Sequence, residues 1–159
     1  YTVGMTIMKK IKPNINYGEF HKLRNSGGLY VLALVGAGEF FLKVGTSSNV
    51  NSRLYDLAKH CKYRYKFYIL NLIELERVSA TLLETKCLVS TAGFGFKPRY
   101  FTNNGFTECK KATKETLSRL NALDVISEMK IEQLREIYKL HSINRFETEY
   151  KTFKYELRS

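Results

Sequence analysis

The chain has 159 residues, of which 44% are hydrophobic and 26% charged, and it contains no apolar run long enough to span a bilayer. This length suits one domain with a sizeable core and argues against two. The formal net charge of +11 is spread along the chain and favours a polyanionic partner, with nucleic acid as the first candidate and a merely basic surface as the alternative.

The first half of the chain predicts a hairpin followed by a helix. Two apolar, β-prone segments, 28–35 and 40–45, are joined by a Gly-rich connector, which is typical of a β-hairpin. The next polar residues offer three helix N-cap side chains, those of Ser47, Ser48 and Asn49. An amphipathic helix is expected over 49–61, since apolar residues recur there at three- and four-residue steps, at Val50, Leu54, Leu57 and Ala58.

Further along, residues 64–72 mix aromatic and β-branched side chains and predict a third strand. A longer helix is expected over 74–90, with its apolar side at Leu75, Val78, Leu82 and Leu83. Glycines, a proline and an Asn pair indicate a loop over 91–105, and residues 105–111 form either a short strand or a turn. From about residue 113 two helices are predicted, with an apolar stripe at Leu117, Leu120, Leu134, Ile137, Tyr138 and Leu140.

This order predicts an α+β fold in which a small antiparallel three-stranded sheet is flanked by helices, with added C-terminal helices. We divide the chain into a basic N-terminal arm (1–26), a core domain (27–110) and a helical extension (111–159) on or beside the core. The extension could recognise substrate or mediate dimerisation, but its near balance of charge and its apolar stripe favour packing.

The three cysteines and the N-terminal residues indicate where in the cell the protein is expected. Cys61, Cys87 and Cys109 are odd in number and form no C-x-x-C pair, so we expect reduced thiols rather than a disulfide or a zinc site. The N-terminal residues lack the apolar stretch that a signal peptide needs. We therefore expect a cytoplasmic protein that is not in a membrane.

Four short motifs stand in a suggestive order: GLY at 28–30, KVG at 43–45, an arginine at 53 and LE at 83–84. Their order and spacing resemble the GIY-YIG nuclease superfamily, most closely its phage and bacterial branch, whose second motif commonly reads Lys-Ile-Gly followed by Thr. Residues 105–108 resemble the late Gly-x-x-Glu element of that branch. The resemblance covers about residues 27–110 and implies a metal-dependent DNA endonuclease.

The resemblance also implies roles for individual residues. Tyr30 matches the tyrosine that helps to activate the attacking water, although a phenol with a pKa near 10 is a poor base unless cations help it. Lys43 stands where most members have a second tyrosine, and its ammonium could stabilise a tyrosinate or a phosphate oxygen. Arg53 matches the transition-state arginine, which can bind phosphate in a bidentate manner. Glu84 matches the carboxylate that holds one divalent metal ion, Mg²⁺ or Mn²⁺.

Several positions stay open. Glu74 and Glu76 compete with Glu84, which alone has the family spacing. Leu57 stands where many members have a histidine or tyrosine, so His60 is a candidate replacement. A late asparagine is expected near the metal, at Asn103 or Asn104, and we take Asn104. Glu108 is either a second carboxylate beside the metal ligand or an N-terminal charge on the next helix.

Basic residues with aromatic residues between them indicate contacts to phosphates and bases. The expected nucleic-acid-binding residues are Lys59, Lys62, Arg64, Lys66, Lys97 and Arg99. The aromatic residues of 63–68 either stack on bases or belong to the core, and the loop 94–104 is the better candidate for substrate contact.

The leading hypothesis is therefore a DNA endonuclease of the phage, homing or restriction type, in a bacterial or phage-infected cell. A monomer would nick its substrate, whereas a homodimer could cut both strands. The alternatives are a catalytically inactive GIY-YIG-like module that binds nucleic acid and a basic interaction domain whose resemblance is accidental.

Overall fold

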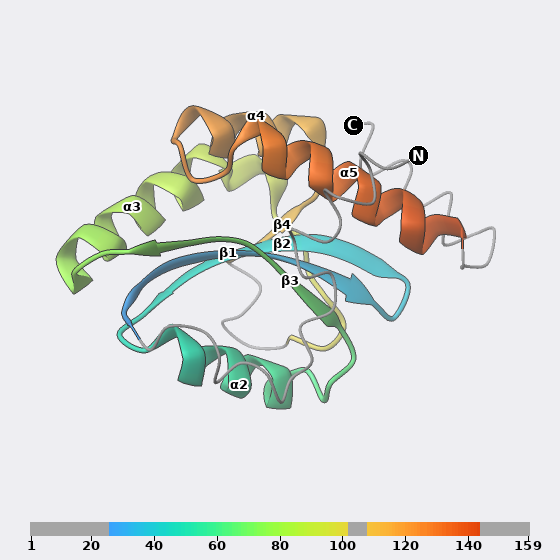
Figure 1. Cartoon of the computed structure of the whole chain (residues 1–159), viewed down its shortest axis with the longest axis horizontal. Helices are drawn as coiled ribbons and strands as arrows, with labels where there is room; N and C mark the ends of the chain where they lie inside the picture. Colours follow the sequence, from blue (N-terminus) through green and yellow to red (C-terminus); the bar gives the residue numbers. More distant parts are fainter. Residues whose placement is uncertain (1–25, 102–107, 144–159) are drawn as a thin grey trace.

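The computed structural model describes residues 26–101 and 108–143, which form an α+β fold with one antiparallel sheet (Figure 1). The elements in chain order are β1 (Gly28–Gly36), β2 (Glu39–Ser47), α2 (Val50–His60), β3 (Lys66–Glu74), α3 (Arg77–Ser90), the 3₁₀ turn η2 (Ala92–Phe94), β4 (Cys109–Lys111), α4 (Lys114–Ala122) and α5 (Glu128–Ile143). The predicted fold class is confirmed. No helix in the described part of the chain is long and apolar enough to cross a membrane.

The hairpin of β1 and β2 is confirmed, with Gly36 opposite Glu39 at its turn. The two residues between them, Ala37 and Gly38, both have positive φ angles, 51° and 75°, as a type I′ turn requires. The two strands pair in register to their far ends, Gly28 opposite Ser47. This register determines which residues of the GLY motif (28–30) lie opposite which residues of the KVG motif (43–45).

The sheet differs from the prediction in its number of strands. Its described strands are four rather than three, in the order β3-β1-β2-β4. The added strand is β4, which pairs antiparallel with residues 41–43 of β2 and resolves the choice left open for residues 105–111 in favour of a strand at 109–111. A three-residue strand is too short to show a periodic pattern, and its pairing partner lies far away in sequence.

Helices cover both faces of the sheet, with α3, α4 and α5 on one side and α2 on the other (Figure 1). Alternate residues of β1 divide between two hydrophobic clusters because successive strand side chains point to opposite faces. Leu29 and Val31 join residues of α3, α4 and α5, whereas Tyr30 and Leu32 join residues of α2. Tyr30 therefore points toward α2.

The prediction for α2 is confirmed and that for α3 is partly wrong. In α2 the buried residues are the expected ones, and Asn49 is the N-cap, accepting from the Ser52 N–H at 3.1 Å. In α3 the helix begins at Arg77, and Val78 and Leu82 are 66% and 61% exposed. The buried residues of α3 are instead Ala80 and Cys87. Their short side chains let the helix approach the sheet closely.

The C-terminal helices α4 and α5 confirm the predicted pair and pack on the sheet. Five residues of the predicted stripe are buried in the cluster that includes Leu29 and Val31, namely Leu117, Leu120, Leu134, Ile137 and Tyr138. The side chain of Leu140 and the N-terminal residues 1–25 lie outside the described part of the chain. The packing supports the interpretation of these helices as part of the scaffold.

Candidate active site beside strand β2

Tyr30 and Gly45 lie directly opposite each other in the hairpin. The tyrosine ring crosses over the glycine so closely that a Cβ added to Gly45 would overlap the Tyr30 hydroxyl and ring. Any larger residue at position 45 would therefore displace the phenol. The close contact gives a physical reason for a glycine at this point of the second motif.

The Tyr30 side chain is fully buried, and its hydroxyl has no partner with hydrogen-bonding geometry among the described residues. Burial raises the pKa of Tyr30 well above its usual value, and the negative charge of Glu108 raises it further. The Arg53 guanidinium, from the second turn of α2, lies close enough to oppose this shift through its charge and its interaction with the hydroxyl. The net result is a phenol that stays protonated at neutral pH.

Lys43 lies two residues before Gly45 on the same face of β2 and is completely buried. Its ammonium is 3.1 Å from Oε1 of Glu108 and 5.4 Å from the centre of the Phe101 ring. Glu108 comes directly before β4, whose Cys109 is the pairing partner of Lys43. The register of β2 and β4 thus creates the ion pair, and the alternative of Glu108 as an N-terminal charge on a helix is wrong.

Glu84 reaches this place from α3, on the opposite layer to α2. Within the described residues, the pairing of β4 with β2 ends at Lys43. The Glu84 carboxylate interacts with the backbone N–H of Thr46, three residues further along β2. Burial raises the pKa of Glu84 and Glu108 raises it further, whereas the Lys43 charge, the Thr46 N–H and Arg53 lower it. The half-buried carboxylate is therefore coupled to both cations of the site.

The two competing glutamates lie elsewhere. Glu74 ends β3, and β1 separates that strand from β2. Glu76 is the exposed N-cap of α3, where its carboxylate accepts from the Ser79 hydroxyl at 3.2 Å. Of the three candidates, Glu84 is the one that the structure brings to Tyr30.

Other predicted residues are not brought into this cluster. His60 is exposed on the last turn of α2, with its ring 5.9 Å from that of Phe101, and Leu57 is buried in the core. Asn103 and Asn104 lie outside the described residues. The six predicted nucleic-acid-binding residues are all exposed: Lys59, Lys62, Arg64, Lys66, Lys97 and Arg99. Among the aromatic residues of 63–68, the core alternative is confirmed for Tyr65, Phe67 and Tyr68, while Tyr63 is 53% exposed.

The oxygen donors of this site, two carboxylates, fit a hard divalent cation that keeps several of its waters. In the described part of the chain, no three His, Cys, Asp or Glu side chains gather in a potential metal site. Glu84 and Glu108 nevertheless lie near enough for the charge of one to raise the pKa of the other. Two carboxylates with retained waters suit Mg²⁺ or Mn²⁺, which prefer oxygen ligands and lose water reluctantly.

A cavity of about 520 Å³ adjoins the Thr46 end of the site. It lies between the end of β2 and the start of α3, and its lining is rich in hydroxyl groups, with Arg77 as its one basic residue: Gly27, Thr46, Ser47, Ser48, Leu75, Glu76, Arg77, Ala80 and Thr81. The cavity leaves room for a polar molecule next to the residue that anchors Glu84.

No family profile matches the chain, and comparisons with curated proteins and with solved structures return no significant match. The class of site is therefore defined by this chain's own residues: a buried phenol, two cationic side chains and two carboxylates beside one sheet edge. Membership of the GIY-YIG superfamily stays a prediction.

Proposed function

We propose that the protein is a metal-dependent endonuclease that hydrolyses phosphodiester bonds in DNA through Tyr30, Lys43, Arg53 and Glu84. One observation carries this proposal: side chains from β1, β2, α2 and α3 interact electrostatically at one place. The net charge of +11 supports a nucleic acid as the substrate. The three cysteines are buried and free, which is compatible with a cytoplasmic location.

The two cations would neutralise the negative charge on the nonbridging phosphate oxygens during hydrolysis. Arg53 is exposed and its guanidinium can bind two phosphate oxygens at once. Lys43 is held in place by Glu108 and the Phe101 ring, so it supplies a fixed positive charge from inside the sheet. Preorganised charges of this kind need no rearrangement at the moment of reaction.

Tyr30 would orient the attacking water and pass a proton within the site. Its raised pKa keeps the phenol protonated in the resting protein, and the two nearby carboxylates are part of the cause. Glu84, with Glu108 beside it, would hold the divalent cation, which when bound supplies charge neutralisation and activation of water. Any group that cancels the negative charge of these carboxylates brings the phenol closer to ionisation.

The alternative is a module of the same shape that binds nucleic acid without cutting it. Two observations favour it: the Lys43 ammonium is already paired with Glu108, and position 57 is a buried leucine. Leucine cannot transfer a proton, so position 57 lacks the proton-transfer group that the resemblance leads us to expect there.

Incubation of the purified protein with supercoiled plasmid and Mg²⁺ tests the proposal. We expect nicked or linear DNA with the wild type, none in EDTA, and none with Glu84→Gln. Glu76→Gln is the control, since it removes an exposed carboxylate eight residues earlier, at the N-cap of the same helix. Mg²⁺ should also raise the Tm of the wild type and not that of Glu84→Gln.

Intact plasmid that shifts on a gel in a salt-sensitive way would establish the binding module instead. Equal cutting by Glu84→Gln and the wild type would refute the assigned site. The ratio of nicked to linear product, measured against protein concentration, distinguishes a monomer from a homodimer that cuts both strands.

A further inference from the structure

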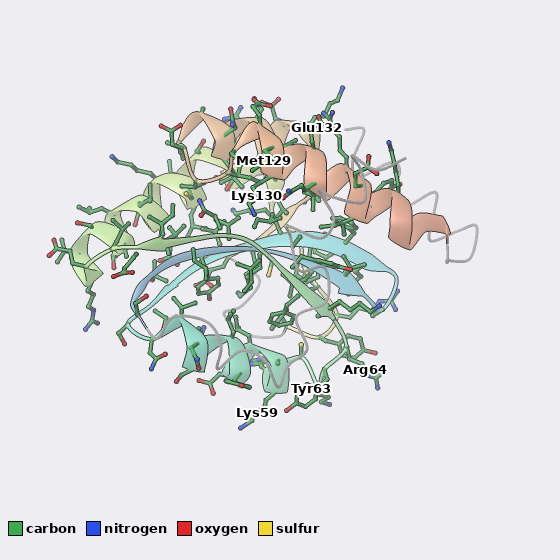
Figure 2. The ribbon with its side chains drawn as sticks, in the orientation of Figure 1. Lys59, Tyr63, Arg64, Met129, Lys130 and Glu132 are labelled. Carbon is green, nitrogen blue, oxygen red and sulfur yellow. The ribbon has the colours of Figure 1, made fainter. Side chains whose placement is uncertain are left out.

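A second charged surface lies at the C-terminal end of α2 and in the turn that follows it. Figure 2 shows Lys59, Tyr63 and Arg64 there, at the end of the helix and in the turn that follows. We call it the α2-turn surface and define it by six residues: Lys59, Lys62, Tyr63, Arg64, Arg99 and Tyr100. Four of these are cationic, and Tyr63 presents an exposed aromatic ring among them.

The turn that carries Tyr63 has an unusual backbone. Lys62 and Tyr63 both have positive φ angles, 54° and 57°, a conformation that non-glycine residues rarely adopt. Backbone hydrogen bonds fix the turn, from the Tyr63 N–H to the Ala58 carbonyl at 2.9 Å and from the Arg64 N–H to the Cys61 carbonyl at 3.1 Å. Tyr63 is therefore presented to solvent by a rigid turn, and backbone strain of this kind is common at functional sites.

The second half of the surface is tied to the sheet. The Tyr65 hydroxyl donates to the Glu39 carboxylate at 2.6 Å, the Arg99 N–H donates to the same oxygen at 3.2 Å, and the Tyr100 N–H donates to the Tyr65 hydroxyl at 3.1 Å. The Arg64 guanidinium lies 5.1 Å from the centre of the Tyr100 ring. The Glu39 carboxylate is buried and engaged in these bonds, so it is not itself offered to a ligand at this surface.

The α2-turn surface lies close to the candidate active site. The Phe101 ring is 5.4 Å from the Lys43 ammonium and 5.9 Å from the His60 ring, so those two groups are at most about 11 Å apart. The end of α2 is therefore separated from the Lys43 ammonium by little more than the buried Phe101 ring.

We propose that the α2-turn surface binds an unpaired stretch of the DNA strand beside the reacting phosphate, with one base stacked on Tyr63. This inference rests on the proposed function for the position of the reacting phosphate. Cations alone would suit any phosphate backbone, duplex included. An exposed aromatic ring among them suits a base whose face is uncovered, as in single strands, flaps and junctions.

Binding measured by fluorescence anisotropy in EDTA tests the proposal without cutting. The probes are a short single-stranded DNA oligonucleotide and the blunt duplex of the same sequence. We expect the wild type to bind the single strand at least about tenfold more tightly than the duplex. Tyr63→Ala should weaken single-strand binding about tenfold to a hundredfold, the effect of losing one base–aromatic stack, and should change duplex binding less than about twofold.

Two further variants make the readout specific. Tyr63→Phe keeps the ring and should bind like the wild type. Met129→Ala is the matched control, because Met129 is 51% exposed on α5, on the other side of the sheet (Figure 2). Quenching of 2-aminopurine in the single strand by the wild type, and not by Tyr63→Ala, reports the stack directly.

The proposal is overturned if Tyr63→Ala binds the single strand as Met129→Ala does, or if the wild type binds duplex at least as tightly. Its failure is distinguishable from failure of the nuclease proposal. Metal-dependent plasmid cutting by the wild type, together with single-strand binding that Tyr63→Ala leaves unchanged, would retain the nuclease and reject the unpaired strand. Tyr63-dependent binding of single strands without cutting would retain this surface and reject the nuclease.

Discussion

Replacing Gly45 with alanine tests the close contact on which the candidate active site depends. The three atoms nearest to an added Cβ all belong to Tyr30: its hydroxyl and two ring carbons. Gly45 lies within the regular pairing of β1 and β2, so the new methyl group is opposed by that one side chain. The tyrosine must move for the methyl group to fit, and its hydroxyl then leaves the neighbourhood of Arg53.

The magnitude follows from the cost of overpacking a buried position, which is about 1–3 kcal/mol per substitution. For a chain of this size, each kcal/mol changes the Tm by about 2–4 °C, so Gly45→Ala should lower the Tm by about 2–12 °C. The cleavage rate should also fall under conditions where the variant is fully folded, since the phenol is displaced in its folded state.

Thermal unfolding followed by circular dichroism measures this effect. Gly93→Ala is the matched control, because an added Cβ at Gly93 meets no atom within 4 Å. Combining Gly45→Ala with Tyr30→Leu should recover part of the lost stability, and the double-mutant cycle gives the coupling. If Gly45→Ala melts like Gly93→Ala, or the cycle shows no coupling, the tyrosine does not lie over the glycine and the arrangement is wrong.

The other predictions concern the charges around Tyr30. Tyr30→Phe should raise the free energy of unfolding by about 1 kcal/mol, because it removes a buried hydroxyl without a well-formed hydrogen bond, yet it should abolish cleavage; a loss of stability would contradict this. Glu108→Gln should cost about 3 kcal/mol because it removes the carboxylate that lies 3.1 Å from the buried Lys43 ammonium, and adding Lys43→Met should restore most of this in urea unfolding. Glu84→Gln should be more stable than the wild type at pH 7, because the folded state raises the pKa of Glu84 above its usual 4.5 and so disfavours the ionised form. The difference should disappear as the pH falls below 4.5, where Glu84 is protonated in both states, and a difference that grows on acidification would refute the sign.

Local signals were sufficient for the hairpin and for α2. The connector between the strands contains the glycine that a type I′ turn favours, and Asn49 is an ordinary N-cap followed by a regular apolar stripe. Each of these elements is determined by residues close together in sequence. The sequence therefore predicts them with their boundaries within about two residues.

Pairings between distant residues were harder to predict. The partnership of Lys43 with Glu108 depends on the register of β2 with a three-residue strand, 65 positions further along the chain. The face of α3 was misjudged because Val78 and Leu82 are more hydrophobic than the residues that pack. Helix periodicity cannot reveal that the face with the small side chains of Ala80 and Cys87 packs on the sheet and so brings Glu84 to it.

The position of Glu84 at the edge of β2 also has a consequence for solubility. Strand edges offer backbone groups to any other strand, and proteins commonly protect them with charge. Among the described residues no strand pairs with β2 beyond Lys43 on the β4 side, and there the Glu84 carboxylate lies at the Thr46 N–H and places a negative charge where a second copy would have to pair. A variant that silences the site by neutralising this residue thus loses a barrier to aggregation. Light scattering should accompany every assay of such a variant, so that precipitation is not mistaken for lost activity.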